Sequence, residues 1–492
     1  MPAKTSAALL AVCLIVIIHS CTKTYNGGLS GSFSGGSPGI GTIVGNTDSI
    51  VENSFIKTAD SATSTFSIDA DGGSYALARK LINSNPANLD SYKEAIRTEE
   101  FINYFTYDYP DATNAESIAV NGEVSECPWN TQHKLIRIGV KGKSVDRANY
   151  PYANFVLLID VSGSMGSPDK LQLLKDGFVS FVNQMRPQDR IAIVTYAGQE
   201  SVALQSTPGT QKTKIIDAIN HLGSGGSTNG SAGIRKAYEI AQSNFIQGGN
   251  NRVILGTDGD FNVGITSTDE LINLIEEKKN SGVFLTTLGV GLGNYNESMM
   301  EKLADKGNGT YEYLDSKEEL EKVFVTEYNK FITEAKDVKI QVTFNKDIVE
   351  EYRLIGYENR VLQTNDFTDD SKDAGEIGAG QTITAIYEIK PKANGDYLTK
   401  SSFTIHFRYK KPDEDVSRLI DLDVYDAGHN FNAASENMRF AASLASLGLY
   451  LRNSAYKGDA TIQKIRAWSA TAASFDPFGY RSRHIQLLQR IN

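Results

Sequence analysis

Residues 154–164 read NFVLLIDVSGS, and this stretch decides the fold of the central part of the chain. Its five consecutive apolar residues, FVLLI at 155–159, are typical of a strand that is buried on both faces of a parallel sheet. From this point onward strand, turn and helix patterns alternate, which indicates crossover helices between parallel strands. The sequence therefore predicts a doubly wound, mostly parallel α/β domain.

The remaining elements of this domain are expected where the apolar pattern changes its period. Short apolar runs predict further strands at 190–196, 252–257, 283–289 and, more weakly, 310–314. Apolar residues at helical spacing predict helices at 169–185, 212–221, 231–245, 269–280 and 317–335. The domain is expected to close near residue 335.

Oxygen-bearing side chains follow the buried strand at its carboxyl end, where open α/β sheets bind ligands. Asp160, Ser162 and Ser164 alternate along a loop in which the intervening glycine permits a tight curve. One carboxylate and two hydroxyls are hard ligands that suit Mg²⁺, Mn²⁺ or Ca²⁺. Thr228 in GGSTNG and Asp258 in TDG are expected at the ends of other strands of the same sheet. Five oxygen donors from three loops are therefore expected to converge.

The order Asp-x-Ser-x-Ser, then Thr, then Asp resembles the metal-ion-dependent adhesion site of von Willebrand factor A domains, and all five positions are filled. The resemblance implies a Rossmann-like A domain with Mg²⁺ as its cofactor, and with Mn²⁺ or Ca²⁺ as alternatives. It also implies that Asp160, Ser162 and Ser164 hold the ion, and that Thr228 and Asp258 join directly or through water. An acidic residue of a protein ligand would supply a further oxygen. Without the resemblance, an Asp-x-Ser-x-Ser pattern is also compatible with helix caps and a solvated turn.

The flanking segments are similar to a bacterial group of A-domain lipoproteins that are often labelled calcium-activated chloride channel homologues. The similarity rests on EEFINYF at 99–105, YDYP at 107–110, LIGYENR at 354–360, DAGEIGAG at 373–380 and GYR at 479–481. It covers nearly all of the chain beyond the Gly/Ser-rich N-terminal tether. A channel function is not expected, because the mature chain lacks the run of roughly 20 apolar residues that a spanning helix needs.

Alternating polarity marks half-buried strands on both sides of the A domain. Before the A domain the alternation lies at about 117–142, and after it within about 337–425. Neither flank alone holds the roughly seven strands of a full sandwich. Both flanks are therefore expected to build one β-sandwich, with the A domain inserted between them.

Two local patterns complete the expectations for these flanks. An Asn-Gly dipeptide between the runs 383–389 and 403–409 predicts a hairpin, although the connection is longer than two residues. Helical spacing of apolar residues predicts helices at 75–84 and 92–105, and a helical segment at 431–492.

The N-terminus has the features of a bacterial lipoprotein signal. Lys4 precedes an apolar run, residues 7–18, that is too short to cross a bilayer. The tetrapeptide IHSC that ends at Cys21 resembles a lipobox, which implies that Cys21 is lipidated after cleavage. A plain secretory signal or a retained membrane anchor is the alternative. The Gly/Ser-rich residues 26–46 should form a flexible tether.

Composition and missing motifs disfavour several classes of function. The net charge of −10, from 49 Lys plus Arg against 59 Asp plus Glu, argues against nucleic acid as the main partner. The sequence lacks HExxH, and its glycine-rich stretches lack the Lys-Ser/Thr end of a phosphate loop, so metalloprotease and nucleotide-binding functions are disfavoured. Ser162 stands where aspartyl-phosphate phosphatases have a second Asp, which argues against a metal-dependent hydrolase. No residue near Cys127 in the sequence is recognisable as an acid or base that would activate its thiol, so Cys127 is expected to be buried and inert.

These observations predict a lipid-anchored protein that binds a protein ligand, through an acidic residue of that ligand, at a divalent-cation site. It is expected not to be an enzyme, and neither nucleic acid nor nucleotide is expected as a partner. The alternatives are an architectural envelope protein with a structural ion and, with less support, a metal-dependent hydrolase. The expected location is the bacterial cell envelope, on the periplasmic side of the outer membrane. The expected domains are a lipoprotein signal peptide at 1–20, a tether at 21–51, an N-terminal helical and strand module at 52–150, the A domain at 151–335, a β-rich module at 336–430 and a helical segment at 431–492.

Overall fold

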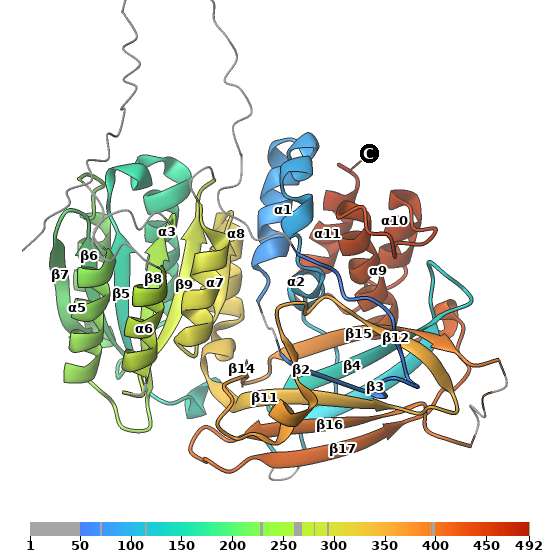
Figure 1. The fold of residues 1–492 in the computed structure, drawn as a ribbon. Helices are drawn as coiled ribbons and strands as arrows, with labels where there is room; N and C mark the ends of the chain where they lie inside the picture. The colour runs from blue at the N-terminus through green and yellow to red at the C-terminus, as the bar shows by residue number, and fades with distance from the viewer. Residues whose placement is uncertain are drawn as a thin grey trace, which may run out of the picture. The chain divides into compact units, whose positions relative to one another are not determined.

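A computed structural model of the chain describes residues 50–68, 71–113, 116–226, 230–259, 268–279, 281–292, 295–393, 395 and 399–491. Its central part holds a six-stranded sheet of order β10-β9-β8-β5-β6-β7 (Figure 1). The strands are β5 (Ala153–Asp160), β6 (Arg190–Tyr196), β7 (Glu200–Pro208), β8 (Asn250–Thr257), β9 (Phe284–Val290) and β10 (Tyr311–Leu314). All neighbouring pairs are parallel except β6 and β7, which are antiparallel.

Helices cover both faces of this sheet, as the doubly wound prediction requires (Figure 1). They are α3 (Leu173–Gln184), α4 (Lys212–Asn220), α5 (Gly230–Ser243), α6 (Thr268–Lys279), α7 (Glu297–Lys306) and α8 (Lys317–Glu321). Along β5, Phe155 and Leu157 join the core beneath α3, α4 and α8, whereas Val156 and Leu158 join the core beneath α5, α6 and α7. The uninterrupted apolar run of β5 is thus explained by burial on both faces.

Two further sheets form a sandwich beside this domain (Figure 1). The first has the order β1-β12-β15-β4-β3 and consists of β1 (Ile56–Lys57), β12 (Val349–Ile355), β15 (Thr382–Pro391), β4 (Lys134–Gly142) and β3 (Ile118–Glu126). The second has the order β13-β2-β11-β16-β17, and β14 (Gly375–Gly378) also pairs with β11. Its strands are β13 (Val361–Leu362), β2 (Thr63–Ser67), β11 (Thr333–Phe344), β16 (Phe403–Lys410) and β17 (Arg418–Val424).

The segments before and after the A domain share the first sheet of this sandwich. β4 pairs with β15 in antiparallel register, from Lys134 opposite Ile389 to Lys141 opposite Thr382. Side chains of both flanks, among them Ile138 and Ile340, fill one core between the two sheets. The A domain is therefore an insertion within the sandwich, as expected from the alternation on either side.

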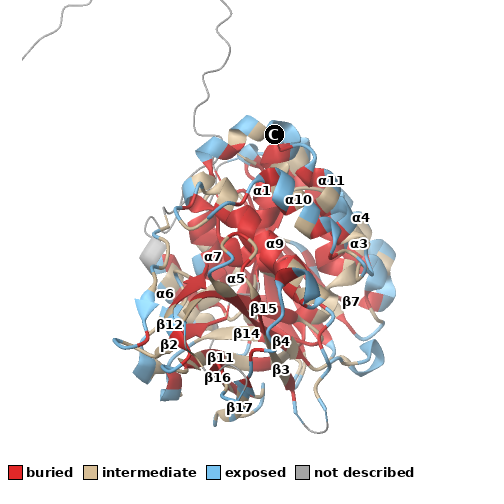
Figure 2. Ribbon diagram, turned by 90° about the vertical axis from the view of Figure 1, so that its right-hand side faces the viewer, coloured by how far each residue is buried: buried red, intermediate tan, exposed pale blue. Residues whose placement is uncertain are grey.

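Helices from both ends of the chain pack into another common core. They are α1 (Gly73–Ser84), α2 (Thr98–Asn103), α9 (Glu436–Leu451), α10 (Ile462–Ala470) and α11 (Tyr480–Leu488). Tyr75 and Phe101 meet Phe440 and Leu444 in this core, and α9 is buried along most of its length (Figure 2). Among the described residues, no helix combines the length and the apolar character needed to cross a bilayer.

Three of the local predictions were wrong. The helix expected at 92–105 is interrupted, because Ile96 and Arg97 are extended between a short turn at Lys93–Ala95 and α2. The helix expected at 317–335 ends at Glu321; short helical turns follow to Phe331, and β11 begins at Thr333. The hairpin expected around Asn394-Gly395 does not form, because β15 lies between β12 and β4 whereas β16 lies between β11 and β17 in the other sheet. Asn394 itself lies outside the described residues.

Candidate metal centre

Asp160 lies where the strand order of the α/β sheet reverses. The chain leaves β5 toward β6 and β7, and then returns to β8 on the opposite side of β5. Such a reversal leaves a crevice at the carboxyl ends of the strands, which is the usual ligand site of this architecture. Asp160 is the last residue of β5 and is fully buried. The fold therefore places a buried carboxylate at the base of this crevice.

Both oxygens of the Asp160 carboxylate are held by hydrogen bonds. The backbone N–H of Ser162 donates to Oδ1 at 2.8 Å, and the hydroxyl of Thr257, at the end of β8, donates to Oδ2 at 2.9 Å. Burial raises the pKa of Asp160 to about 6; these hydrogen bonds oppose that shift, and the charge of Asp258 adds to it. A nearby divalent cation would favour the ionised form of this carboxylate.

The two serines of the loop stand together. Ser162 Oγ and Ser164 Oγ lie 3.0 Å apart; Ser162 is buried, while Ser164 is exposed. The glycine-rich loop is fixed against them, because Gly163 N donates to Gly226 O at 3.1 Å and Gly225 N donates to Val161 O at 2.7 Å. Thr228, two residues beyond Gly226, lies outside the described residues.

Asp258 follows β8 and is also fully buried. Its Oδ2 accepts a hydrogen bond from Lys170 Nζ at 2.8 Å, and the same ammonium donates to the carbonyl oxygen of Ser164 at 3.0 Å. The structure thus brings four of the five predicted residues, Asp160, Ser162, Ser164 and Asp258, to one end of the sheet. It adds a lysine that the sequence did not single out.

The chemistry of these donors fits a hard divalent cation. A buried carboxylate and two adjacent hydroxyls offer only oxygen, which suits Mg²⁺, Mn²⁺ or Ca²⁺. In the part of the chain that the structure describes, no cluster of three or more His, Cys, Asp or Glu side chains could hold a metal ion. On the chemistry of its own oxygen donors, the hydroxyl-rich loop after β5 is the candidate metal centre.

The remaining sequence predictions concern the cysteines. Cys127 is fully buried within the helical core, and burial raises the pKa of its thiol well above the ordinary value. The inert role expected for it follows from this burial. Cys21, the predicted lipidation residue, lies outside the described residues together with the tether at 26–46.

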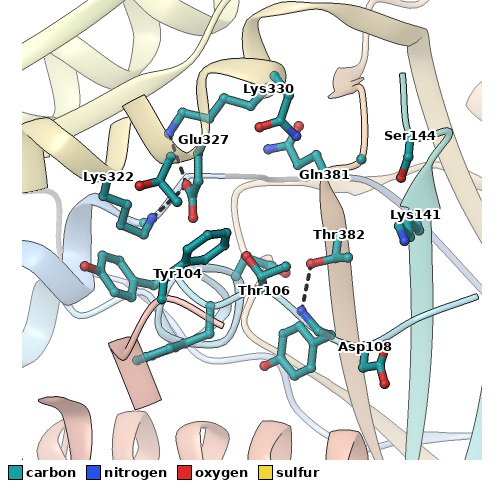
Figure 3. A pocket seen from close by; sticks show the side chains of 18 of the residues that line it. Tyr104, Thr106, Asp108, Lys141, Ser144, Lys322, Glu327, Lys330, Gln381 and Thr382 are labelled. Carbon is teal, nitrogen blue, oxygen red and sulfur yellow. Dashed lines mark hydrogen bonds and ion pairs between the residues drawn. The ribbon is translucent and has the colours of Figure 1, made fainter. Parts of the chain in front are cut away.

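A described cavity lies away from the metal centre, and none of the candidate ligands lines it. It has a volume of about 420 Å³, and it is lined by residues of the N-terminal part, the end of the A domain, the sandwich and the C-terminal loop (Figure 3). Its lysines are paired internally, with Lys322 Nζ 2.8 Å from Glu327 Oε2 and Lys330 bonded to Glu312. These two lysines are thus neutralised by carboxylates that also line the cavity, whereas Nζ of Lys141, another lining residue, lies 3.7 Å from Oδ2 of Asp111.

Three family descriptions match successive parts of the chain. Residues 45–137 match the description "von Willebrand factor", and residues 154–326 match the von Willebrand factor type A domain. Residues 329–492 match "Uncharacterized protein YfbK, C-terminal". The middle match covers the α/β sheet and the candidate metal centre.

Similar proteins include YfbK of Escherichia coli (strain K12), with 41% identity over 463 residues that span 89% of this chain and 79% of YfbK. Inter alpha-trypsin inhibitor, heavy chain 4, of Mus musculus is 27% identical over 40% of this chain and 22% of its own length. A solved von Willebrand factor type A structure from Catenulispora acidiphila covers 77% of this chain and 91% of its own, with 16% identity and a TM-score of 0.43. On its identity to YfbK and the matching domains, this chain belongs to the YfbK family of von Willebrand factor type A domain proteins.

Proposed function

We propose that the protein binds a protein ligand through a divalent cation held by Asp160, Ser162 and Ser164, and that it catalyses no reaction. The observation that carries this proposal is the grouping of a buried, doubly hydrogen-bonded carboxylate with two hydroxyls that lie 3.0 Å apart. Thr228 and Asp258 complete the proposed set, directly or through water. Mg²⁺ is the proposed ion, and Mn²⁺ or Ca²⁺ could replace it.

Exposure of the loop favours ligand binding over a purely structural ion. Ser164 is exposed, and so is the glycine-rich stretch 223–226 beside it, whereas Asp160 beneath them is buried. An ion held here would be reachable from solvent on the serine side. Hydroxyls are neutral ligands that leave much of the ionic charge uncompensated, so an acidic side chain of a partner would gain by joining the set.

We further propose that lipid on Cys21 holds the protein at a membrane of the bacterial cell envelope, facing the periplasm from the outer membrane. The support is the lipobox-like sequence before Cys21 and the Gly/Ser-rich stretch after it. A tether of this composition would let the folded part reach partners away from the membrane surface.

A pulldown from envelope extracts tests the binding function. The purified protein is incubated with extract in Mg²⁺, and parallel samples receive a chelator or carry Asp160→Ala. The proposal predicts a protein that is captured by the parent in Mg²⁺ and lost in both parallel samples. Capture that is indifferent to the chelator and to the substitution would contradict a cation-dependent interaction.

A further inference from the structure

Lys170 places an ammonium group among the candidate metal ligands. It lies in the helical turn Pro168–Gln172 that precedes α3, and its side chain is almost completely buried. Its Nζ bonds the carboxylate of Asp258 at 2.8 Å and the carbonyl of Ser164 at 3.0 Å. One ammonium therefore bridges the loop after β5 and the loop after β8, both of which carry predicted ligands.

A third loop fixes the course of this side chain. The aliphatic part of Lys170 lies against Gly291, just beyond β9, where a Cβ would clash with Lys170 Cε. Gly291 adopts a φ of 79°, which also favours glycine, and its carbonyl accepts a hydrogen bond from Tyr313 Oη at 2.7 Å. The contact with Gly291 thus guides the Lys170 side chain toward Asp258 and the carbonyl of Ser164. Because it is buried, solvent and salt screen its charge only weakly.

The charges of this centre depend on the lysine. Ionised Asp160 and Asp258 together with Lys170 carry one net negative charge, which a divalent cation would convert to one net positive charge. An acidic partner residue would then bring the centre to neutrality. Without Lys170, the two carboxylates alone would neutralise the cation, and little positive charge would remain to attract an acidic partner.

We propose that Lys170 sets the electrostatic balance of the metal centre: it weakens divalent-cation binding and keeps the loaded site positive toward acidic ligands. This inference rests on the proposed function and specifies how the same site is tuned. It requires that a neutral residue at position 170 raise the affinity of the site for the cation and lower the affinity of the loaded site for an acidic ligand. A lysine that merely braced the loops would shift both affinities downward when it is replaced.

The test compares Mn²⁺ binding by the parent and by Lys170→Met, with free Mn²⁺ measured by electron paramagnetic resonance. Met keeps the length and flexibility of the side chain against Gly291 but carries no charge. The substitution should tighten Mn²⁺ binding by about tenfold, as expected from removing a weakly screened like charge. Lys170→Gln, which retains an N–H donor, should also bind Mn²⁺ more tightly, and thermal melting verifies that each variant is folded.

Lys80→Met provides a matched control for the loss of charge. Lys80 Nζ lies 2.8 Å from the carboxylate of Asp169, a half-exposed residue beside Lys170 that is not a candidate ligand. This variant should bind Mn²⁺ within about twofold of the parent, because a more exposed pair is screened by solvent. Lys170→Arg, which keeps the charge, should not show the tightening of the neutral variants.

Acetate serves as a minimal carboxylate probe of the loaded site. In the Mn²⁺-saturated protein, acetate that displaces ion-bound water lowers the water-proton relaxation rate. The inference predicts that Lys170→Met needs several-fold more acetate than the parent for the same change. Equal or weaker Mn²⁺ binding by both folded neutral variants, or equal acetate responses, would overturn it.

Mn²⁺ binding by the parent separates this inference from the proposed function. If the parent binds Mn²⁺ and the neutral variants bind no more tightly, only the role of Lys170 fails. If the parent binds none but Lys170→Met does, the lysine suppresses cation binding as inferred, and the cation-dependent function of the native chain fails. If neither binds, both proposals are wrong.

Discussion

Thr257 Oγ1 donates a hydrogen bond to Asp160 Oδ2 at 2.9 Å, from the carboxyl end of β8 to that of β5. The parallel register of these strands, in which Ile159 stands opposite Gly256, brings the two residues together. The same hydroxyl accepts a hydrogen bond from Gly259 N at 3.1 Å. Thr257 therefore orients the carboxylate and ties it to the loop that carries Asp258.

Thr257→Val tests this orientation, because valine keeps the shape of threonine and removes its hydroxyl. Asp160 would lose one of its hydrogen bonds, so the free energy of unfolding should fall by roughly 1–3 kcal/mol. Mn²⁺ affinity should also fall several-fold, because the carboxylate is no longer held in place. Thermal melting and Mn²⁺ titration measure the two effects. Thr195→Val on β6 is the control, and an equal loss of affinity in both variants would argue against a specific role for Thr257.

His484 should make stability depend on pH. Burial lowers its pKa to about 3, from an ordinary value near 6.5, and Tyr75 Oη lies 2.9 Å from its Nδ1. The unfolded chain therefore takes up a proton that the folded chain does not between about pH 6.5 and 3. His484 should destabilise the fold by up to about 1.4 kcal/mol for each unit that pH falls through this window.

The measurement is denaturant unfolding of the parent and of His484→Asn at several pH values from 7 to 4. Asn keeps a polar group near Tyr75 but does not titrate in this range, so its stability should fall less steeply on acidification. His429→Asn is the control, because His429 is exposed. Parallel pH profiles for the parent and His484→Asn would show that His484 is not the responsible group.

Because both flanks share one sandwich core, we expect a substitution in that core to lower the stability of the chain without changing its affinity for the metal. Ile138 of β4 is fully buried between the sheets. Ile138→Ala should lower the free energy of unfolding by about 2–5 kcal/mol and leave the Mn²⁺ affinity of the folded protein unchanged. Val416→Ala removes a side chain that is 74% exposed, and it should change stability little. Calorimetric melting together with Mn²⁺ titration checks both expectations.

Lipidation predicts that Cys21 determines where the protein fractionates. Cys21→Ala should release the protein from the membrane fraction, or leave its leader uncleaved, because the acyl chain and its hydrophobic anchoring are absent. Fractionation and mass spectrometry of the N-terminus measure this outcome. Cys127→Ala serves as the cysteine control. Unchanged membrane association of Cys21→Ala, with its leader removed, would refute the anchor.

The strand and the loop of the metal centre could be predicted because both signals are local. The apolar run predicts a strand buried on two faces, and β5 ends at Asp160 as expected. Lys170 could not be predicted in the same way, because a lysine near the start of a helix is ordinarily solvated. Its burial depends on Asp258 and Gly291, which are distant in sequence and meet it only in the folded sheet.

Some helices and strands were not predicted because their places in the folded protein do not follow the usual rule of buried apolar and exposed polar side chains. α7 was not predicted, because it buries carboxylates: Glu297 accepts a hydrogen bond from Tyr92 Oη at 2.9 Å, and Glu301 pairs with Arg97 at 2.8 Å. β7 was not predicted either, because it is an edge strand that is largely exposed. The Asn-Gly signal failed to predict the pairing because the strands on either side of it, β15 and β16, belong to different sheets.

Calorimetric titration of Mg²⁺ or Mn²⁺ into the parent and into Asp160→Ala tests the central claim most directly. The substitution removes a ligand and its charge together, while the rest of the sheet is retained. Asp176→Ala is the matched control, because it removes an exposed carboxylate on α3. The account predicts saturable binding heat for the parent and for Asp176→Ala, and none for a folded Asp160→Ala. Equal heats in the parent and Asp160→Ala would contradict a metal centre at this residue.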